Sequence, residues 1–150
     1  MLSQKAKYAL RALLTLAEAQ EGETVLISDI AERDGIPKKF LEQILLDLKH
    51  HGLLQSRRGR SGGYALLRSP AEISFGQVVR IIDGPLAPLP CLSRVAYRKC
   101  KDCHDETACV LRHVFAASHE ATVTVLDQTS LEDALTGAKE LPQWEMRRVA

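Results

Sequence analysis

Long apolar runs are missing from this 150-residue sequence, and aromatic residues make up only 5% of it. No uncharged apolar stretch approaches the roughly 18 residues that a membrane-spanning helix needs. Lys5, Lys7 and Arg11 interrupt the apolar residues near the N-terminus, which argues against a signal peptide. We therefore expect a cytoplasmic protein without a membrane partner. Hydrophobic residues form 45% of the chain and charged residues 26%, which is typical of a folded, helix-rich domain rather than a disordered one.

Cysteine is absent from most of the chain, because all four cysteines lie in the stretch CLSRVAYRKCKDCHDETAC at residues 91–109. In a reducing compartment, such a group indicates a metal site or a redox switch rather than a disulfide framework. Arg94, Arg98, Lys99 and Lys101 lie in the same stretch. Since nearby positive charge lowers the pKa of a thiol, we expect thiolates suited to ligation or redox chemistry.

Signatures of catalysis are also missing. The residues from Cys100 to Cys103 form a C-x-x-C motif, but no βαβ pattern surrounds it. The sequence contains no glycine-rich cofactor loop and no visible acid–base constellation. It therefore predicts a protein that is not an enzyme, and a redox enzyme is the less favoured alternative.

Charge is unevenly distributed, although the formal net charge is only +1. Residues 36–68 carry seven Lys or Arg against two Asp or Glu, whereas residues 101–140 carry three against eight. This asymmetry predicts that the front half meets an anionic partner and the back half does not.

The front half predicts three helices, at residues 3–20, 28–35 and 36–53. Ser3 and Ser28 are the expected N-caps of the first two. Glycines are expected to end the second and third helices, and Pro37 fits the first turn of the third. The third helix has an apolar stripe of Phe40, Leu41, Ile44, Leu45 and Leu48. Its other side carries Lys38, Lys39, Glu42 and Gln43.

Two helices joined by an Asp-Gly turn, the second with a polar and partly basic outer face, are typical of a helix-turn-helix. An ordinary helical hairpin gives the same pattern. The following stretch, LLQSRRGRSGGYALLRSP, favours the first interpretation, because RRGRSGG between two short apolar runs predicts a β-hairpin with a basic tip. Arg57, Arg58 and Arg60 can contact phosphate or enter a narrow minor groove, although a solvated arginine-rich turn would look similar.

The back half predicts a helix at residues 74–84, an extended proline-rich connection, and a long helix from about Thr107 to Asp127 or beyond. The long helix carries many apolar residues, at Val110, Leu111, Val114, Phe115, Ala121, Thr122, Val125 and Leu126. Nothing downstream is large enough to cover them within one monomer. Packing against the same helix of a second subunit is expected, and it would supply the two-fold symmetry that a palindromic DNA site requires.

These segments also carry a family resemblance. YALRALLTLA, IAERDGIPKKFLEQILLDLKHHGLLQSRRGRSGGYALLRSP and ISFGQVVRIIDGPLAP, over about residues 1–135, resemble the Rrf-two (Rrf2) family of bacterial winged-helix regulators. This family includes the IscR- and NsrR-type iron-sulfur repressors. The resemblance implies a homodimeric transcription factor that binds double-stranded DNA at a partly palindromic operator. It assigns Glu42 and Gln43 to base contacts and Arg58 to the wing, whereas Lys38 and Lys39 depart from the family pattern and suggest phosphate contacts.

The cysteine pattern leaves three interpretations open. Irregularly spaced thiolates suit an iron-sulfur cluster, a structural zinc prefers two close pairs, and a thiol–disulfide switch needs only two neighbouring cysteines. The resemblance favours a cluster of the 2Fe-2S or 4Fe-4S type, because Cys91, Cys103 and Cys109 match the family's three ligands. Cys100 is extra, and it could be a fourth ligand, a substitute ligand or a redox partner. His104 and His113 are weaker candidates, and Arg112 occupies the position of a ligating histidine in some relatives.

The sequence thus predicts a mainly α-helical protein. Residues 1–84 form a winged helix-turn-helix domain with a small β-hairpin wing, and residues 85–106 form a cysteine-rich sensor loop. Residues 107–138 contain the dimerisation helix and a short helix, and residues 139–150 form a tail. The expected function is that of a homodimeric transcriptional regulator, of the repressor type found in the family, whose operator binding is controlled by an iron-sulfur cluster that senses iron, redox state or nitric oxide. A thiol–disulfide or zinc-dependent regulator of the same fold is the alternative.

Overall fold

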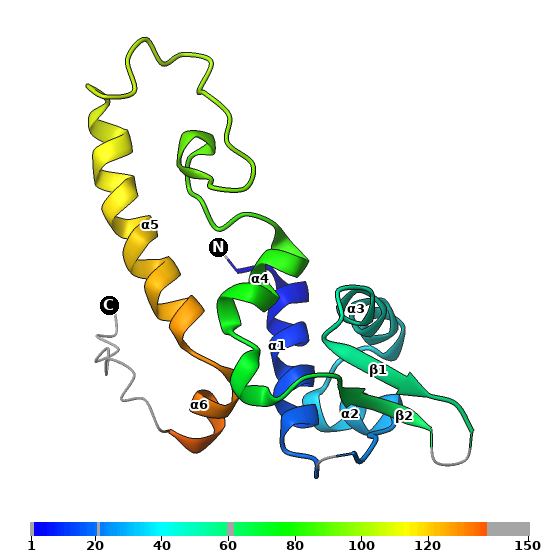
Figure 1. Ribbon diagram of the computed structural model, residues 1–150. Coiled ribbons are helices and arrows are strands. Elements are labelled where there is room, and N and C mark those ends of the chain that lie inside the picture. The colour runs from blue at the N-terminus through cyan, green and yellow to red at the C-terminus, as the bar shows by residue number, and fades with distance from the viewer. Residues whose placement is uncertain (1, 21, 60–61, 138–150) are drawn as a thin grey trace, which may run out of the picture.

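A computed structural model of the chain describes residues 2–20, 22–59 and 62–137, so that Arg60 and the tail at residues 139–150 lie outside it. The described residues form a body and an arm (Figure 1). The body comprises α1 (Gln4–Ala17), α2 (Ile27–Asp34), α3 (Lys38–His50), β1 (Leu54–Arg57), β2 (Gly63–Leu66) and α4 (Phe75–Asp83). The arm comprises an irregular segment and α5 (Val110–Gln128), after which α6 (Leu131–Thr136) returns to the body. Short 3-10 turns lie at Pro70–Glu72 and Pro90–Leu92.

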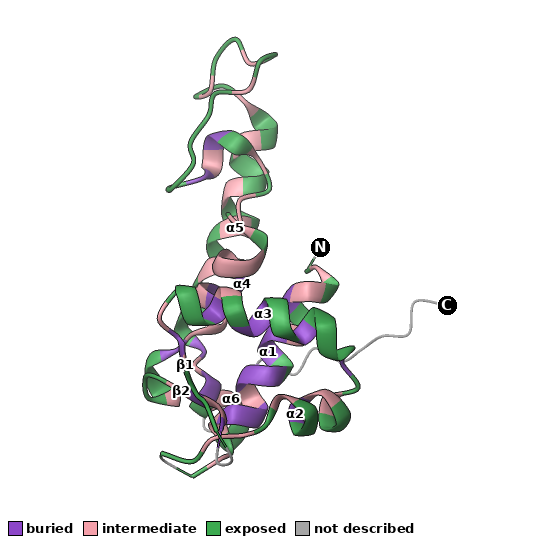
Figure 2. Cartoon of the chain, turned by 90° about the vertical axis from the view of Figure 1, so that its right-hand side faces the viewer, coloured by how far each residue is buried: buried purple, intermediate pink, exposed green. Residues whose placement is uncertain are grey.

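The core lies between the helices of the body (Figure 2). Its fully buried side chains come from every helix there and from the short helix α6, at Leu13, Ile30, Leu41, Ile44, Leu45, Leu48, Leu53, Ile73, Val78 and Leu131. The predicted stripe of α3 is therefore buried except for Phe40, which is 39% exposed. Phe40 instead meets the ring of Tyr8 edge-on, with centroids 5.8 Å apart. This aromatic contact covers the margin of the core at α1 and α3.

Helix starts follow local capping chemistry at most positions. The side-chain oxygens of Ser3, Ser74 and Ser130 accept backbone N–H groups at the starts of α1, α4 and α6. The expectation that Ser28 caps α2 is wrong, because this helix begins at Ile27 with Leu26 as its N-cap. The physical reason is a non-local bridge, in which Val25 and Tyr64 exchange backbone hydrogen bonds of 2.8 and 2.9 Å and fix where the chain leaves its extended conformation.

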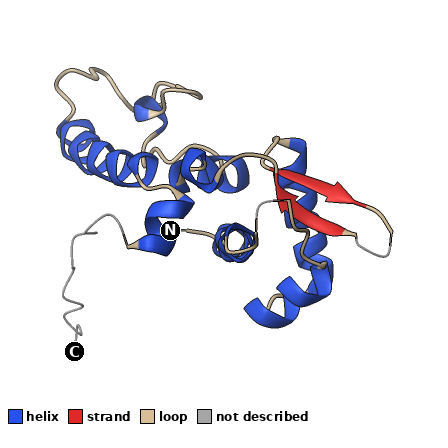
Figure 3. Ribbon diagram, turned by 60° about the horizontal axis from the view of Figure 1, so that its bottom comes forward, coloured by secondary structure: helices blue, strands red, loops and turns tan. Residues whose placement is uncertain are grey.

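The two strands form an antiparallel hairpin in which Leu54 pairs with Leu66 and Arg57 with Gly63. We call β1, β2 and the connecting residues 58–62 the wing. Gly63 has a φ of +138°, and a Cβ there would lie 2.5 Å from the carbonyl oxygen of Val25. Glycine is thus required at this position for the close approach between the wing and the segment before α2. The wing and α5 lie at opposite ends of the molecule (Figure 3).

The arm is joined to the body at the C-terminal end of α5. The guanidinium of Arg80 in α4 pairs with both carboxylate oxygens of Asp127 in α5, at 2.6 and 2.8 Å. Gly76 permits this approach, because a Cβ there would lie 1.9 Å from Asp127 Oδ1. Beyond α5, Leu131 is fully buried in the core and its N–H donates to the carbonyl oxygen of Ile73 at 2.9 Å.

Helix α5 begins later than the sequence indicated, at Val110 rather than about Thr107. Thr107 is held in a turn by bonds from its N–H and hydroxyl to the Asp105 carboxylate, at 2.8 and 2.7 Å. Cys109 is the N-cap, and its sulfur accepts the Arg112 N–H at 3.5 Å. No helix in the part of the chain that the structure describes is long and apolar enough to cross a membrane.

Candidate DNA interface and cysteine site

The connection between α2 and α3 sets how α3 is presented. Gly35 ends α2 in the left-handed conformation at φ +63°, and its N–H bonds the last turn of the helix. The next residue, Ile36, is buried, and its N–H donates to the carbonyl oxygen of Ala31 at 2.9 Å. Pro37 then precedes α3. These contacts anchor the turn in the core and leave the outer face of α3 in solvent.

The polar residues predicted for DNA contact lie on this outer face. Lys38, Lys39, Glu42 and Gln43 are all exposed. Within the described residues, the side chains of the first three make no hydrogen bond or ion pair, so their charged groups are free for a ligand. Gln43 differs, because its Nε2 donates to Asp47 Oδ1 at 3.2 Å and would have to leave this bond to read a base.

Asp47 connects this face to α1. The Lys5 ammonium bonds the Asp47 carboxylate at 2.7 Å and lowers the pKa of that carboxyl, and the hydrogen bond from Gln43 acts in the same direction. Asp47 therefore stays ionised and holds the last turn of α3 against the N-terminal helix.

The wing supplies further positive charge beside α3. Arg57 and Arg58 are exposed, whereas Arg60 lies outside the described residues. The Lys49 ammonium of α3 donates to Ser56 Oγ of β1 at 2.7 Å, which ties the end of α3 to the wing. The structure therefore places the outer face of α3 next to the base of the wing, as the sequence indicated. The DNA contacts of the individual residues remain predictions.

The cysteine-rich segment forms the end of the arm, and hydrogen bonds within it fold it back on itself. The Arg98 N–H donates to the carbonyl oxygen of Pro90 at 3.2 Å, and the Tyr97 hydroxyl donates to Glu106 Oε1 at 2.6 Å. Cys91 is buried in the short turn after α4, and Cys100, Cys103 and Cys109 are partly buried. The segment is thereby folded back near the start of α5, although its first and last cysteines are eighteen residues apart in the sequence.

The thiols influence one another. Burial raises the pKa of the Cys100 thiol, and a side-chain hydrogen bond with Cys91 raises it further. Burial also raises the pKa of Cys103, with an added contribution from the negative charge of Cys109. The expectation that the surrounding cations lower these pKa values is wrong for both residues. Among the cations, only Lys99 lowers the pKa of Cys103. Burial and the neighbouring sulfur raise that pKa and outweigh the effect of exposed positive charges.

Arg112 closes the site from α5, a role that its sequence position did not reveal. Its Nη1 donates to the carbonyl oxygen of Cys91 at 2.6 Å, and its backbone N–H donates to the sulfur of Cys109. The pKa of Arg112 is raised chiefly by a hydrogen bond with the Cys91 side chain. One arginine thus links the first and last cysteines. An arginine three residues after the last cysteine was the available signal in the sequence.

Neither of the two candidate histidines makes a hydrogen bond with a thiol in the described part of the chain. His113 Nε2 bonds the carbonyl oxygen of Thr107 at 2.8 Å, and His104 is exposed. In the described part of the chain, no three His, Cys, Asp or Glu side chains are arranged to hold a single metal ion. Four interacting thiols are nonetheless a donor set that suits an iron-sulfur cluster, which is larger than one ion and is held by thiolates.

The outer face of α5 is apolar and uncovered. None of the residues of α5 is buried, and Val110, Leu111 and Val114 are 72%, 62% and 62% exposed. A row of exposed aliphatic side chains along one helix is typical of an interface. The eight apolar positions predicted for the core or an interface are therefore not core positions of the monomer.

Comparisons with known proteins agree with this architecture. A model of the Rrf2 family, described as iron-dependent transcriptional regulators, matches residues 2–137. An rrf2-like HTH-type transcriptional regulator of Rhodobacter capsulatus is 53% identical over 138 residues, covering 90% of this chain and 92% of the relative.

Solved structures of similar fold include two regulators with different names. CymR of B. subtilis, described as the global cysteine regulator, matches with a TM-score of 0.76 and 27% identity, over 93% of this chain and 98% of the other. T. potens IscR matches with a TM-score of 0.72 and 29% identity, over 93% of this chain and 89% of the other. The winged-helix fold predicted from the sequence is confirmed by these similarities.

Proposed function

The chain belongs to the Rrf2 family of transcriptional regulators, and we propose that it is a homodimeric regulator whose operator binding depends on an iron-sulfur cluster. The observation that carries this proposal is the gathering of Cys91, Cys100, Cys103 and Cys109 at the start of α5. Resemblance to IscR-type regulators supports the same cofactor. A regulator of this kind acts on the chromosome, in the cytoplasm.

The ligand set that we propose consists of the four thiolates. Cys91, Cys103 and Cys109 follow the family pattern, and the hydrogen bond between Cys100 and Cys91 supports Cys100 as the fourth ligand. Arg112 holds the Cys91 backbone against α5, and His113 is engaged with the Thr107 carbonyl oxygen. When bound, such a cluster supplies one-electron redox chemistry and can be lost or modified by oxidant or nitric oxide.

The DNA-facing residues divide into two kinds by chemistry. Glu42 can accept a hydrogen bond from cytosine and Gln43 can pair with adenine in the major groove. Lys38, Lys39, Arg57, Arg58 and Arg60 supply positive charge for phosphate or minor-groove contacts. Two copies of α3 related by the α5 interface would face two half-sites of a palindrome, which lie about 34 Å apart when centred one helical turn from each other.

A change in the cysteine segment can reach α3 through packed elements. The segment contacts the start of α5, Arg80 and Asp127 join α5 to α4, and α4 packs in the body beside α1 and α3. We infer that the state of the cysteines biases the relative placement of the two DNA-binding bodies, so that one state is DNA-competent and the other is not.

A thiol–disulfide regulator is the second candidate, and the Cys91–Cys100 contact favours it. Two neighbouring thiols can form a disulfide when an oxidant such as peroxide removes two electrons and two protons. CymR, whose structure is similar to this chain, is described as a cysteine regulator. The same fold therefore also occurs in a regulator whose description refers to cysteine. A zinc site is less favoured, because no three of the described ligand-type side chains are arranged around one position.

Purification without oxygen tests the cofactor. Iron and acid-labile sulfide should be present in equal amounts, and the optical and Mössbauer spectra should show a cluster that is lost in Cys109→Ser. DNA selected from a random pool should then bind with different affinity before and after cluster removal. Protein without iron and sulfide that carries a Cys91–Cys100 disulfide would support the second candidate. Equal DNA affinity of the two forms would end the sensing proposal.

Arg58→Ala tests the DNA interface separately from the cofactor. We expect weaker operator binding and a salt dependence whose slope falls by about 1, because one phosphate contact is lost. Arg58→Lys keeps the charge and should retain most of the slope. A response to salt that is flat in the unmodified protein would contradict DNA binding through this surface.

A further inference from the structure

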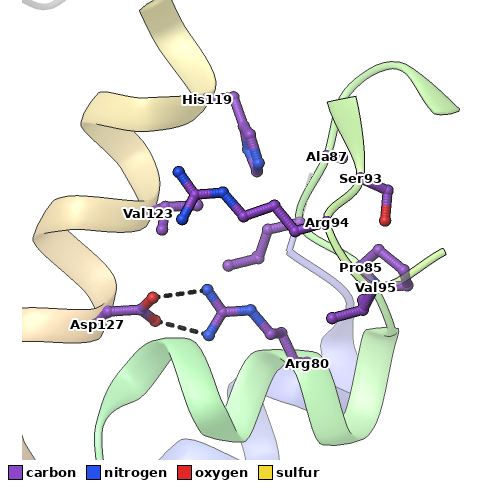
Figure 4. A pocket seen from close by; sticks show the side chains of 10 residues that line it. Arg80, Pro85, Ala87, Ser93, Arg94, Val95, His119, Val123 and Asp127 are labelled. Atoms are coloured by element: carbon purple, nitrogen blue, oxygen red, sulfur yellow. Dashed lines mark hydrogen bonds and ion pairs between the residues drawn. The ribbon is translucent and has the colours of Figure 1, made fainter. Parts of the chain in front are cut away.

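A cavity of about 220 Å³ lies where α4, the connection after it and α5 meet (Figure 4). It is separate from the outer face of α3 and from the four thiols. Its walls are partly apolar, with Pro85, Leu86, Ala87, Val95 and Val123. Its polar lining consists of Arg80, Ser93, Arg94, His119 and Asp127. The mixture of short aliphatic walls and a few polar groups is typical of a small-molecule site.

His119 marks this cavity as more than a packing gap. Its Nδ1 is fully buried and has no hydrogen-bond partner among the described residues. The imidazole lies toward the cavity, across from the side chain of Arg94 (Figure 4). Buried side-chain nitrogens in folded proteins nearly always have a partner. A ligand with a hydrogen-bonding group at this end of the cavity would supply one.

The two arginines of the lining differ in how firmly they are held. Arg80 is bound through two nitrogens to Asp127. Arg94 makes one contact, in which its Nη2 lies 3.1 Å from Glu120 Oε2, and the two side chains are 76% and 62% exposed. Such an exposed pair contributes little and is readily exchanged. The guanidinium of Arg94 is therefore available to a competing carboxylate, which it can bind through two parallel hydrogen bonds.

The position of the cavity leaves it accessible when α5 forms an interface. His119, Val123 and Asp127 are spaced four residues apart and share the face of α5 that looks toward the body. The exposed aliphatic residues Leu111 and Val114 fall on roughly the opposite face by the same spacing. A second subunit on that opposite face would not fill the cavity.

We propose that this cavity binds a small organic monoanion, a carboxylate with a short apolar body, as an effector distinct from the iron-sulfur cluster. The carboxylate accepts hydrogen bonds from Arg94 and His119, and the apolar body packs against Val95 and Val123. The volume is below the roughly 300 Å³ at which pockets for drug-sized ligands begin, so the ligand has only a few heavy atoms. Asp127 already neutralises Arg80, so the anion would take the place of the Glu120 carboxylate at Arg94.

Occupation of this cavity would bear on the relative placement of body and arm. The lining comes from α4, from residues 85–95 and from α5, and the Arg80–Asp127 pair forms its floor. A ligand that bridges Arg94 and His119 would strengthen the contact between the connection and α5. Because it contacts both parts at once, it would favour one of their relative positions over others.

Propionate is the probe, titrated into the full chain prepared without oxygen, with the NMR signals of the His119 imidazole as the readout. The signals are identified by their loss in His119→Gln. We expect saturable shifts with propionate and none with propionamide, which has the same shape without the charge. Arg94→Gln should weaken the apparent affinity about tenfold or more, because a charge-assisted hydrogen bond is lost.

Arg33→Gln is the matched control, since Arg33 also forms a surface ion pair, with Glu18, but lies on α2 away from the cavity. It should bind propionate as the unmodified chain does. Shifts that do not saturate, shifts of equal size with propionamide, or an affinity unchanged by Arg94→Gln would each overturn the proposal. Circular dichroism of Arg94→Gln confirms that the variant is folded before it is titrated.

Discussion

At the scale of single residues, the outer face of α3 carries exposed side chains that make no bond and one that is already hydrogen-bonded within the described residues. The Glu42 carboxylate is exposed and free within the described residues, whereas Gln43 bonds Asp47 at 3.2 Å. A free acceptor next to lysines can read a cytosine without first losing an intramolecular bond. Glu42 is therefore the better candidate of the two for base recognition.

Glu42→Gln should change which base the protein prefers at one position of each half-site. The isosteric amide removes the charge and adds a donor, so about 1–3 kcal/mol of discrimination should be lost at that position. Selection from random DNA measures the preference. Lys39→Gln is the control, because loss of a phosphate contact should weaken binding to all sequences and reduce the salt slope by about 1. An unaltered base preference in Glu42→Gln would contradict the assignment.

Residue types and spacing predicted the exposed polar face of α3, whose DNA contacts remain a prediction, but not how the residues of the cysteine segment interact. The cations of the cysteine segment were expected to lower the thiol pKa values, yet burial and neighbouring sulfur raise those of Cys100 and Cys103. Arg112, which does contact the site, comes from the following helix. Spacing along an irregular segment does not determine which side chains meet, because the path of such a segment is set by contacts rather than by a repeating geometry.

At the scale of elements, the helix starts could be predicted where capping is local. Ser3, Ser74 and Ser130 cap helices through bonds to residues three positions ahead, so their role can be read from sequence. The start of α2 could not, because the bridge between Val25 and Tyr64 joins residues far apart in the chain. The same limitation applies to the ion pair that joins α1 to α3.

The Lys5–Asp47 pair should stabilise the body in a pH-dependent way. Lys5 lowers the folded-state pKa of Asp47, so the pair contributes above the unfolded-state pKa of about 3.9 and the contribution is lost as pH falls through the lower folded-state value. Lys5→Met should reduce the free energy of unfolding by about 0.5–1 kcal/mol at pH 7, since both groups are partly exposed.

Denaturant unfolding of Lys5→Met and the unmodified chain at several pH values measures this effect. The difference between them should begin to shrink below about pH 4, where Asp47 of the unfolded chain becomes protonated, and should disappear once the folded-state carboxyl, with its lower pKa, is protonated too. Lys7→Met is the control, because Lys7 is exposed and forms no ion pair within the described residues. A difference that is independent of pH would show that Lys5 acts through packing rather than through charge.

At the scale of the whole molecule, the sequence predicted the order of the parts, and the structure adds how they are joined. The long helix was expected to expose apolar residues, and none of its residues is buried. The burial of Leu131 in the core was not visible, because a six-residue helix with one buried leucine resembles any surface helix. Helix α6 thus fixes the C-terminal end of α5 to the body that carries the wing.

The exposed face of α5 should hold two subunits together. Val114→Glu places a charge among exposed aliphatic side chains, so we expect a monomer and a large loss of operator affinity, because one half-site alone is then bound. Analytical ultracentrifugation measures the oligomeric state. Leu67→Glu is the control, since Leu67 is 54% exposed near the wing and should leave the oligomeric state unchanged. A dimer that persists in Val114→Glu would place the interface elsewhere.

The contact between Gly76 and Asp127 has an evolutionary consequence. The Asp127 carboxylate is held by two bonds to Arg80, so it cannot turn away from a new side chain at position 76 without breaking that pair. Positions 76 and 80 of α4 and position 127 of α5 are therefore constrained to change together. Among homologues that keep arginine and aspartate at the other two positions, glycine should persist at position 76, and lineages that lose the ion pair should be the ones in which alanine or serine appears there.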